Sequence, residues 1–451
     1  MSSRIYRKTA TSKPERPTAQ PLQQVATVPR GQSASSALTW WAACAFAAIL
    51  GFSRLSYGLL MPALHAILGV SYSILGLVQT LNYGGYLLGT LLLPLLLLRV
   101  RNRIGLNLVA LVAMGICMAA SALSWTLWQL AVFRFLIGVF SALATVLTMA
   151  LTLERIEPSQ RGQASAIAWI GGMLGIVFSG LIVPPLILAG TSVGWRLTWI
   201  VMGMVGGVSA VGFSLVCSRI PSSAKMAAPV QERIGSERRT RNQPSSLLQV
   251  FLPRHLLFLT LTYTIFGASY IIYMTFFIPL LVQQGVSAFN TGFVWAAIGA
   301  AAALSGWFWG KVLDRWPSGY TLAGTLALGM LGALSVLIPS LAGEALGAAL
   351  FGLAATISPA LMVTTLLKRA VADGDYTVVY SVLTALFAAG QIAGPLGASF
   401  VVARFGLTAG IATSAVLFAL AVLCACGYGA MQRRELSHAA DGWFVQERPG
   451  E

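Results

Sequence analysis

The sequence predicts an all-α integral membrane protein whose twelve transmembrane helices form two six-helix bundles. Hydrophobic residues make up 57% of the 451 residues and charged residues only 9%, with a mean hydropathy of +0.78. Soluble domains are about a quarter charged, so a single core surrounded by water could not bury this much apolar sequence. Apolar runs long enough to cross a bilayer recur along the chain, and its two halves share a sequence repeat.

Polar segments divide the chain into five parts. Residues 1–38 are basic, rich in Ser, Thr, Gln and Pro, and lack the apolar stretch of a signal peptide, so we expect a disordered cytoplasmic tail. Residues 219–254 combine basic residues with Pro and Ser and are predicted to form a flexible cytoplasmic linker. The N-terminal bundle then covers residues 39–218, the C-terminal bundle covers 255–431, and residues 432–451 form a second cytoplasmic tail.

The apolar runs are assigned to helices rather than strands, because none shows the ten-residue alternation of a membrane barrel. The predicted spans in the first half are 40–67, 73–98, 104–125, 128–152, 163–189 and 196–218. Those in the second half are 256–283, 288–312, 320–340, 343–366, 377–403 and 407–431.

The placement of Lys and Arg predicts the orientation of the chain in the membrane. Of the 29 basic residues, only Arg196 and Arg404 fall on one predicted side, Arg54 and Arg134 lie within helices, and all the others share the opposite side. Since basic residues concentrate in cytoplasmic loops, we expect a multi-pass protein of the bacterial inner membrane with both termini in the cytoplasm. The net charge of +16 then follows from topology in a lipid bilayer, and no nucleic-acid partner is expected.

The first and second halves repeat one another around their first two helices. Gly51, Ser53 and Tyr57 recur at a constant offset as Gly267, Ser269 and Tyr273. The stretch "GVSYSILGLV" (69–78) matches "GVSAFNTGFV" (285–294) at the same offset. Six-helix halves related in this way are the architecture of one class of transporters, which bind substrate near the membrane midplane between the halves.

Several short motifs resemble those of the major facilitator superfamily over residues 39–431. They are "RFLIGVFSA" (134–142), "PSQRGQA" (158–164), "GWRLTWIVMG" (194–203) and "GKVLDRW" (310–316). The last is similar to the superfamily's cytoplasmic gating motif, and the resemblance implies a gating role for Gly310, Asp314 and Arg315. The equivalent segment of the first half has Leu98 in place of the aspartate.

A narrower resemblance is to the YbfB/YjiJ-like branch of this superfamily. It is carried by "GFSRLSYGLLMP" (51–62), "NYGGYLLG" (82–89) and "YIIYMTFFIP" (270–279). Members of that branch are known as permeases of unassigned substrate, so the resemblance implies the fold and a transport activity and little about the solute.

Two arginines inside the predicted helices are the main candidates for a substrate site. Arg54 lies near the middle of the first helix and Arg134 lies in the fourth, while all 13 acids lie in tails, loops or helix ends. An intramembrane charge is costly and is usually paired, so a substrate anion is one possible partner, because guanidinium binds carboxylate, phosphonate or sulfonate groups through paired hydrogen bonds. For Arg54 the alternative is a structural role, with the guanidinium held by backbone carbonyls, Gln79, Asn82 or water. For Arg134 the resemblance of "RFLIGVFSA" to the superfamily motif implies a role in coupling or helix packing, so Arg54 is the favoured substrate contact.

Amides and aromatic side chains supply the remaining candidates. Gln79, Asn82, Tyr83 and Tyr86 share one face of the second helix, and an aromatic stripe at helical spacing runs along the seventh. The repeat places Tyr270 opposite Arg54, although packing alone is a common reason for such a stripe. The predicted substrate-binding residues are Arg54, Tyr57, Gln79, Asn82, Tyr83, Arg134, Tyr270, Tyr273 and Gln391.

Proton coupling has no clear carrier in the sequence. Membrane carboxylates commonly carry protons, and none is predicted deep in a helix. His65, near the periplasmic end of the first helix, is the one intramembrane group expected to titrate near neutral pH, although a lone histidine is more often structural. Coupling through a protonatable substrate and uncoupled facilitated diffusion both remain open.

The sequence therefore favours a monomeric transporter that moves a small organic anion by alternating access. A multidrug or neutral, sugar-like efflux permease is the alternative with the same fold, in which both arginines are structural. A polytopic membrane enzyme is disfavoured, because the sequence lacks a predicted cluster of acids, histidines or metal ligands. No metal or cofactor is expected, and no nucleotide-binding G-x-x-x-x-G-K-[ST] pattern occurs.

Overall fold

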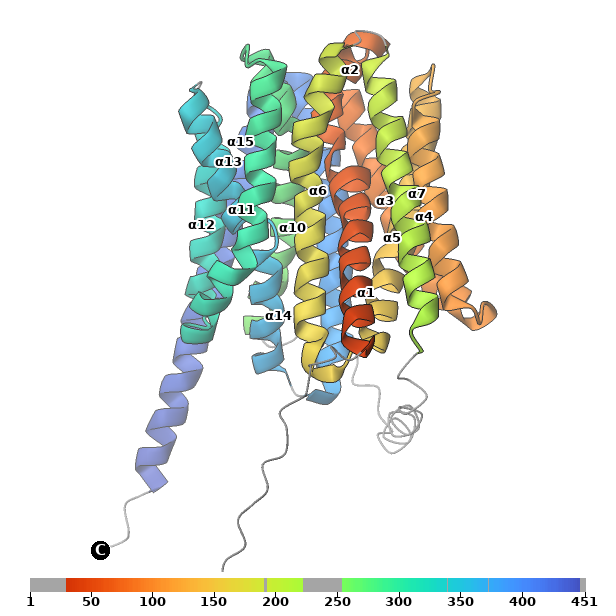
Figure 1. Cartoon of the computed structure of the whole chain (residues 1–451). Coiled ribbons are helices and arrows are strands. Elements are labelled where there is room, and N and C mark those ends of the chain that lie inside the picture. The colour runs from red at the N-terminus through yellow and green to blue at the C-terminus, as the bar shows by residue number, and fades with distance from the viewer. Residues whose placement is uncertain (1–29, 190–192, 222–253, 339, 372, 447–451) are drawn as a thin grey trace, which may run out of the picture.

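The structure is a computed structural model that describes residues 30–189, 193–221, 254–338, 340–371 and 373–446. Within these ranges the chain forms long, roughly parallel helices and no strand (Figure 1). Most of the predicted N-terminal tail, most of the predicted linker and residues 447–451 lie outside the described residues.

The helices fall into two sets separated by residues 222–253. The first set is α1 (Arg30–Phe46), the π-helix η1 (Ala47–Leu55), α2 (Tyr57–Leu68), α3 (Tyr72–Arg99), α4 (Arg103–Ser121), α5 (Leu127–Arg155), the 3₁₀ turn η2 (Pro158–Gln160), α6 (Arg161–Ala189) and α7 (Gly194–Arg219). The second set is α10 (Arg254–Gln283), α11 (Ala288–Arg315), α12 (Gly319–Ser335), α13 (Leu341–Ala354), α14 (Ser358–Ala370) and α15 (Asp373–Gln446).

These elements make twelve crossings, which confirms the predicted fold class. Ten segments are long and apolar enough to span a membrane, as judged by length and composition. Two features raise these ten to twelve crossings among the described residues: the shorter apolar α12 provides one, and α15 contains two rather than one. α2 completes the first crossing, and α13 and α14 together form a single one. The break in α15 is at Gly406, whose φ of 84° belongs to the left-handed region that favours glycine.

Both ends of the described chain lie at the same end of the bundle, which we call the terminus side. α1 begins at the lower edge of Figure 1, and the last part of α15 extends past that edge. α1 already begins at Arg30, inside the segment expected to be a disordered tail, and α15 continues to Gln446 within the predicted C-terminal tail. Between Arg30 and the apolar run, "RGQSASSA" contains no proline, so nothing in it interrupts the helix.

Glycines allow equivalent helix pairs in the two halves to pack backbone against backbone. A Cβ on Gly175 of α6 would lie 2.5 Å from the Ala47 carbonyl oxygen, and one on Gly394 of α15 would lie 2.5 Å from the Ala268 carbonyl oxygen of α10. Such distances leave no room for a side chain, as in the small-residue contacts of membrane helices. The fifth crossing (α6) thus packs on the first crossing in the way that the eleventh crossing (the first part of α15) packs on the seventh (α10).

The two halves meet closely on the side opposite the termini. Ser73 of α3 donates to the Ser399 carbonyl of α15 at 2.6 Å, and the Trp295 indole of α11 donates to the Ser179 hydroxyl of α6 at 3.1 Å. Gly58 of α2 lies directly against the Met274 carbonyl of α10, where a Cβ would be 2.4 Å away. These contacts hold the halves together at that end.

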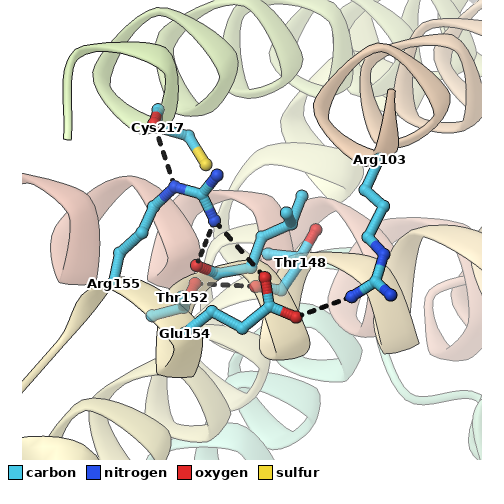
Figure 2. Close-up of polar contacts among 7 residues, drawn as sticks. Arg103, Thr148, Thr152, Glu154, Arg155 and Cys217 are labelled. Carbon is cyan, nitrogen blue, oxygen red and sulfur yellow. Dashed lines mark hydrogen bonds and ion pairs between the residues drawn. The ribbon is translucent and has the colours of Figure 1, made fainter. Parts of the chain in front are cut away.

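A polar cluster joins three helices of the first half on the terminus side (Figure 2). Glu154 at the end of α5 accepts from Arg103 of α4 at 2.9 Å and lies 3.7 Å from Arg155. Arg155 also donates to the Cys217 carbonyl of α7 at 3.1 Å. Because Arg103 and Glu154 are partly exposed, the ion pair itself contributes at most about 1 kcal/mol to stability. The cluster mainly fixes how these helix ends are arranged.

The helix order also sorts the basic residues by side. Arg99, Arg155, Arg219, Arg315 and Arg369 each lie in the last turn of a helix that ends on the terminus side. Arg196, near the start of α7, and Arg404, just before the break in α15, lie at the other end. The asymmetry that the sequence predicted is therefore present along the bundle axis.

The positive-inside asymmetry predicts that the terminus side faces the cytoplasm. Reporter domains active only in one compartment, fused at Gln231 and at the C-terminus, should both report the cytoplasm. A fusion after Arg404, at the other end of the bundle, is the control and should report the periplasm. A periplasmic signal from Gln231 or from the C-terminus would contradict both the orientation and the even number of crossings in each half.

Candidate functional site

The first crossing changes its helical winding where Arg54 lies. Residues Ala47–Leu55 form a π-helix between α1 and α2, and all of them except Ala47 are buried. At its end, the Ser56 amide donates to the Gly51 carbonyl five residues earlier, at 3.0 Å. π-helical segments are wider than α-helices, are rare and occur frequently at functional sites. The equivalent helix of the second half, α10, is α-helical throughout.

Arg134 of α5 supports this π-helix. Its guanidinium donates from Nη1 to the Ser53 carbonyl at 2.7 Å and from Nη2 to Oε1 of Gln79. Gln79 in turn donates to the Arg54 carbonyl at 2.9 Å, and Asn82 donates to the Arg134 carbonyl at 2.8 Å. Arg134 is fully buried. Its guanidinium donates to backbone and amide oxygens near the junction of the π-helix with α2.

Arg54 is held much more loosely. Its Nη2 donates to Oε1 of Gln391 at 3.3 Å, beyond the usual 2.7–3.2 Å of such bonds, and its buried Nε has no hydrogen-bond partner. The guanidinium lies 4.0 Å from the ring centre of Tyr86 and 5.2 Å from that of Tyr83. No acid among the described residues forms an ion pair with Arg54 or Arg134.

A hydrogen-bonded chain connects Arg54 with the second half. Gln391 of α15 accepts from Arg54 and donates through Nε2 to the Tyr270 hydroxyl of α10 at 3.0 Å. Tyr270 is the residue that the repeat placed opposite Arg54. The chain therefore joins equivalent positions of the two halves through one amide side chain.

Aromatic rings from α10 and α15 extend from this chain toward the terminus side. Tyr263, Phe266 and Tyr270 lie on one face of α10, and Phe387 of α15 stacks with all three. Tyr380, two turns before Phe387, stacks on Tyr376 at 5.7 Å. Part of the predicted aromatic stripe, Tyr263, Phe266 and Tyr270, therefore forms one packed set with Phe387.

The predicted site residues fall into three groups. Arg54, Tyr83, Tyr270 and Gln391 come together at the interface of the halves, and Tyr57, Gln79 and Asn82 surround Arg134, with the Tyr57 ring centre 4.5 Å from its guanidinium. Tyr273 is separate: it is fully buried, stacks on Phe277 at 4.6 Å and on Phe351 at 3.7 Å, and has no contact with Arg54.

His65 lies apart from the arginines. It is exposed at the end of α2, its Nδ1 is 2.7 Å from the Val70 carbonyl oxygen, and its ring stacks on Tyr72 at 4.3 Å. It lines a surface cavity of about 480 Å³ with Gln283 and Gly406 on the side opposite the termini. The histidine therefore has local partners that account for its position.

The residues of the expected gate also lie apart from the arginines. Asp314 and Arg315 are exposed at the end of α11, where the Arg315 guanidinium lies 5.4 Å from the Trp316 ring centre. Gly310 stands one turn before them on the same helix. The expected contact between these residues and the other half stays a prediction, since the halves meet at the opposite end in this structure.

Sequence reasoning missed three relevant residues. Phe387 lies one turn before Gln391 on α15, so the same helical spacing that selected Gln391 also points to it. Tyr86, noted on the face of the second helix, is the ring nearest the Arg54 guanidinium. Glu344, counted among acids at helix ends, is 1% exposed in the first turn of α13, with one carboxylate oxygen unpartnered.

Comparison with known proteins identifies the family. The family model described as "Uncharacterised MFS-type transporter YbfB" matches residues 45–427. The chain belongs to this family. The match covers both helical sets and the described residues of the site.

Solved structures of other MFS transporters share the fold. A D-xylose-proton symporter superposes with a TM-score of 0.68 at 14% identity, over 86% of this chain and 97% of that one. The nucleoside transporter NupG gives 0.68 at 11% identity, over 88% and 98%. An inward-facing bacterial homologue of the lysosomal transporter Spinster gives 0.64 at 16% identity, over 90% and 96%. These identities establish the shared architecture only.

Removing the Arg134 side chain should destabilise the MFS fold of this chain. Arg134→Leu leaves the Ser53 carbonyl and Gln79 Oε1 without their donor, which costs about 1–3 kcal/mol for each buried group left unpaired. We expect a lower melting temperature for the purified protein and a smaller loss for Arg134→Lys, which can keep one of the two bonds. Arg404→Leu, at an exposed arginine, is the control. An Arg134→Leu variant that melts like wild type would refute the supporting role.

Replacing Asp314 should slow turnover more than it weakens binding. The resemblance implies a gate that acts when the terminus side closes, and Asp314→Asn removes the charge expected to take part in that contact, with Leu98 unable to substitute for it in the first half. Transport in proteoliposomes and the accessibility of single cysteines on each side would measure the effect. If both remain at wild-type values, the motif has no gating role in this protein.

Proposed function

We propose that this transporter moves a small organic anion across the membrane by alternating access, with Arg54 as the anion's anchor. The observation that carries the proposal is the weak bonding of the Arg54 guanidinium through its Nη atoms: it is buried, and its side-chain bond to the amide of Gln391 is a long one of 3.3 Å, whereas Arg134 bonds to both the Ser53 carbonyl and Gln79. Both arginines have an unpartnered Nε and no carboxylate partner among the described residues. A guanidinium offers five donors in a planar fork that matches carboxylate and phosphonate groups.

The contrast between the two arginines supports this assignment. Both are buried in the first half without an acid, and both lie beside tyrosine rings. Arg134 is used by the Ser53 carbonyl and Gln79, so it supports the π-helix rather than a ligand. Arg54 faces the second half, where Gln391 is its one hydrogen-bond acceptor among the described residues. Arg54 is therefore the better candidate for an anion anchor.

The position of Arg54 between the halves fits a rocking mechanism. Its bond to Gln391 crosses from the first half to the second at about the middle of the helices, while the closest contacts between halves lie on the side opposite the termini. In transporters built from two such halves, substrate binds near the midplane and each side opens in turn. An anion that reaches Arg54 from the terminus side would compete with Gln391 for the guanidinium.

The proposal also includes the membrane location, the orientation and the oligomeric state of the transporter. The basic residues on the terminus side support an inner-membrane protein with both termini in the cytoplasm. The site lies within one chain, so a monomer is sufficient for transport, and the catalytic clusters of a membrane enzyme are not required.

A neutral solute is the second candidate. Gln391 and the hydroxyl of Tyr270 form a polar pair of the kind that binds hydroxylated solutes. Two of the similar structures are named for transport of D-xylose and of nucleosides. In that case Arg54 would serve the structure, and carboxylates would not compete for binding.

Two substitutions at Arg54 distinguish an organic-anion transporter from a neutral-solute transporter. Arg54→Lys keeps the charge but loses the planar fork, so anion binding should weaken while the fold survives. Arg54→Gln should abolish anion binding and leave the melting temperature unchanged or higher, because it removes a buried charge that lacks a charged partner. Melting temperatures measured with and without carboxylates, methylphosphonate and D-xylose would report both binding and stability.

The opposite pattern identifies a structural Arg54. Arg54→Gln would then lower stability by about 1–3 kcal/mol, since buried groups lose their donor, and ligand affinity would stay normal. Arg404→Gln, at an exposed position just before the break in α15, provides the control for charge removal alone. A destabilised Arg54→Gln variant that still binds its ligand with normal affinity would exclude the anchor.

A further inference from the structure

We propose that the preferred anion is an aromatic carboxylate, whose ring stacks on Tyr270 and Phe387 while its carboxylate binds Arg54. This inference rests on the proposed function, since Arg54 provides the recognition of charge. It adds a specific class of substrate, which follows from the rings that surround the guanidinium.

The rings of α10 and α15 share nearly one orientation. Phe387 lies 4.4 Å from Tyr263 at 12° and 6.3 Å from Tyr270 at 5°, measured between ring centres and ring planes. Across the set of Tyr263, Phe266, Tyr270 and Phe387, the angles between contacting rings run from 5° to 26°. Aromatic pairs are stable in edge-to-face as well as offset-stacked arrangements, so a wall with one common ring plane suits a flat partner.

Exposure distinguishes this wall from ordinary packing. Tyr270 and Phe387 are only partly buried, whereas Tyr263 and Phe266 behind them are 5% and 1% exposed. A second aromatic set in the same half, Tyr273, Phe277 and Phe351, is fully buried. The two sets show that the half can bury its rings completely, so Tyr270 and Phe387 remain available to a ligand.

The charged group lies at the end of this wall. Gln391 is one turn beyond Phe387 on α15 and joins Tyr270 to Arg54. On the other side of the guanidinium lies Tyr86 of α3, which is half-buried. The centre of its ring is 4.0 Å from the guanidinium carbon of Arg54. In the proposed complex, a flat anion of benzoate size places its carboxylate on Arg54 and its ring beside Tyr270 and Phe387.

Aromatic rings also mark the face of α15 that leads to the site from the terminus side. Tyr376, Tyr380, Phe387 and Gln391 follow one another at helical spacing, and the first two stack at 5.7 Å with their planes 7° apart. Leu383 and Thr384 fill the turn between Tyr380 and Phe387, and Gln391 follows at the level of Arg54. This order matches a ligand with one aromatic end and one carboxylate end.

Three probes of similar size test the inference on the full-length protein in lipid nanodiscs. Benzoate is flat and charged, cyclohexanecarboxylate is charged but not flat, and benzamide is flat but neutral. Calorimetric titration should give a dissociation constant for benzoate about tenfold lower than for cyclohexanecarboxylate, as expected from stacking beyond simple burial, and no measurable binding of benzamide.

A substitution at Phe387 then tests whether this ring causes the preference for benzoate over cyclohexanecarboxylate. Phe387→Leu should raise the dissociation constant of benzoate by about tenfold and change that of cyclohexanecarboxylate by less than about twofold, because only the stacking partner is lost. Phe405→Leu, on the same helix but 71% exposed, is the matched control and should leave both constants unchanged. Melting temperatures of the variants confirm that the fold is kept.

The outcomes separate this inference from the proposed function. Equal binding of benzoate and cyclohexanecarboxylate would overturn the aromatic preference while leaving the anion anchor in place. A preference for benzoate that persists in Phe387→Leu would overturn the assigned wall. Binding of benzamide as tight as that of benzoate, or binding of neither carboxylate, would overturn the anion proposal and this inference with it.

Discussion

The hydrogen bond from Arg134 to the Ser53 carbonyl is the interaction on which the site depends. A buried guanidinium is expensive in a membrane protein, and here it supplies a donor to backbone beside a widened helix. The second arm of Arg134 reaches Gln79, which in turn binds the Arg54 carbonyl, so three helices of the first half are linked around one charge. This linkage holds the Arg54 backbone in place and leaves its side chain directed at the second half.

The two halves share an architecture but divide the chemistry between them. In each half, the fifth crossing packs on the first through a glycine in the same way. At the site the symmetry ends: the first half has a π-helix and both arginines, whereas the second half has a regular helix and a wall of rings. Gln391 joins the unlike parts, because its amide can accept from Arg54 and donate to Tyr270 at once.

Hydropathy and the internal repeat predicted the twelve helices, since both depend on patterns that extend over whole spans, and the resemblance of several short motifs predicted the family. The repeat also placed Tyr270 opposite Arg54. The sequence favoured Arg54 over Arg134 as the substrate contact, but the bonds of Arg134 to the Ser53 carbonyl and to Gln79 could not be predicted. They depend on which carbonyls the π-helix presents, and periodicity does not report such local winding. The surroundings of Tyr273 could not be predicted for a similar reason. Tyr273 shares the stripe of Tyr270 by spacing, but its position about 60° further round α10 places its ring against Phe351. Glu344 shows that position at a helix end does not imply exposure.

The bond between Arg54 and Gln391 has a kinetic consequence for the empty protein. Under the proposed function, the amide oxygen of Gln391 takes one of the donors that an anion would use, so it is an internal substitute for the cargo. An unloaded Arg54 would have to give up this bond when the halves separate around it, whereas a loaded Arg54 would keep its anion. The proposal therefore implies that the unloaded protein reorients more slowly than the loaded one, which would favour exchange of one anion for another over net flow in a single direction.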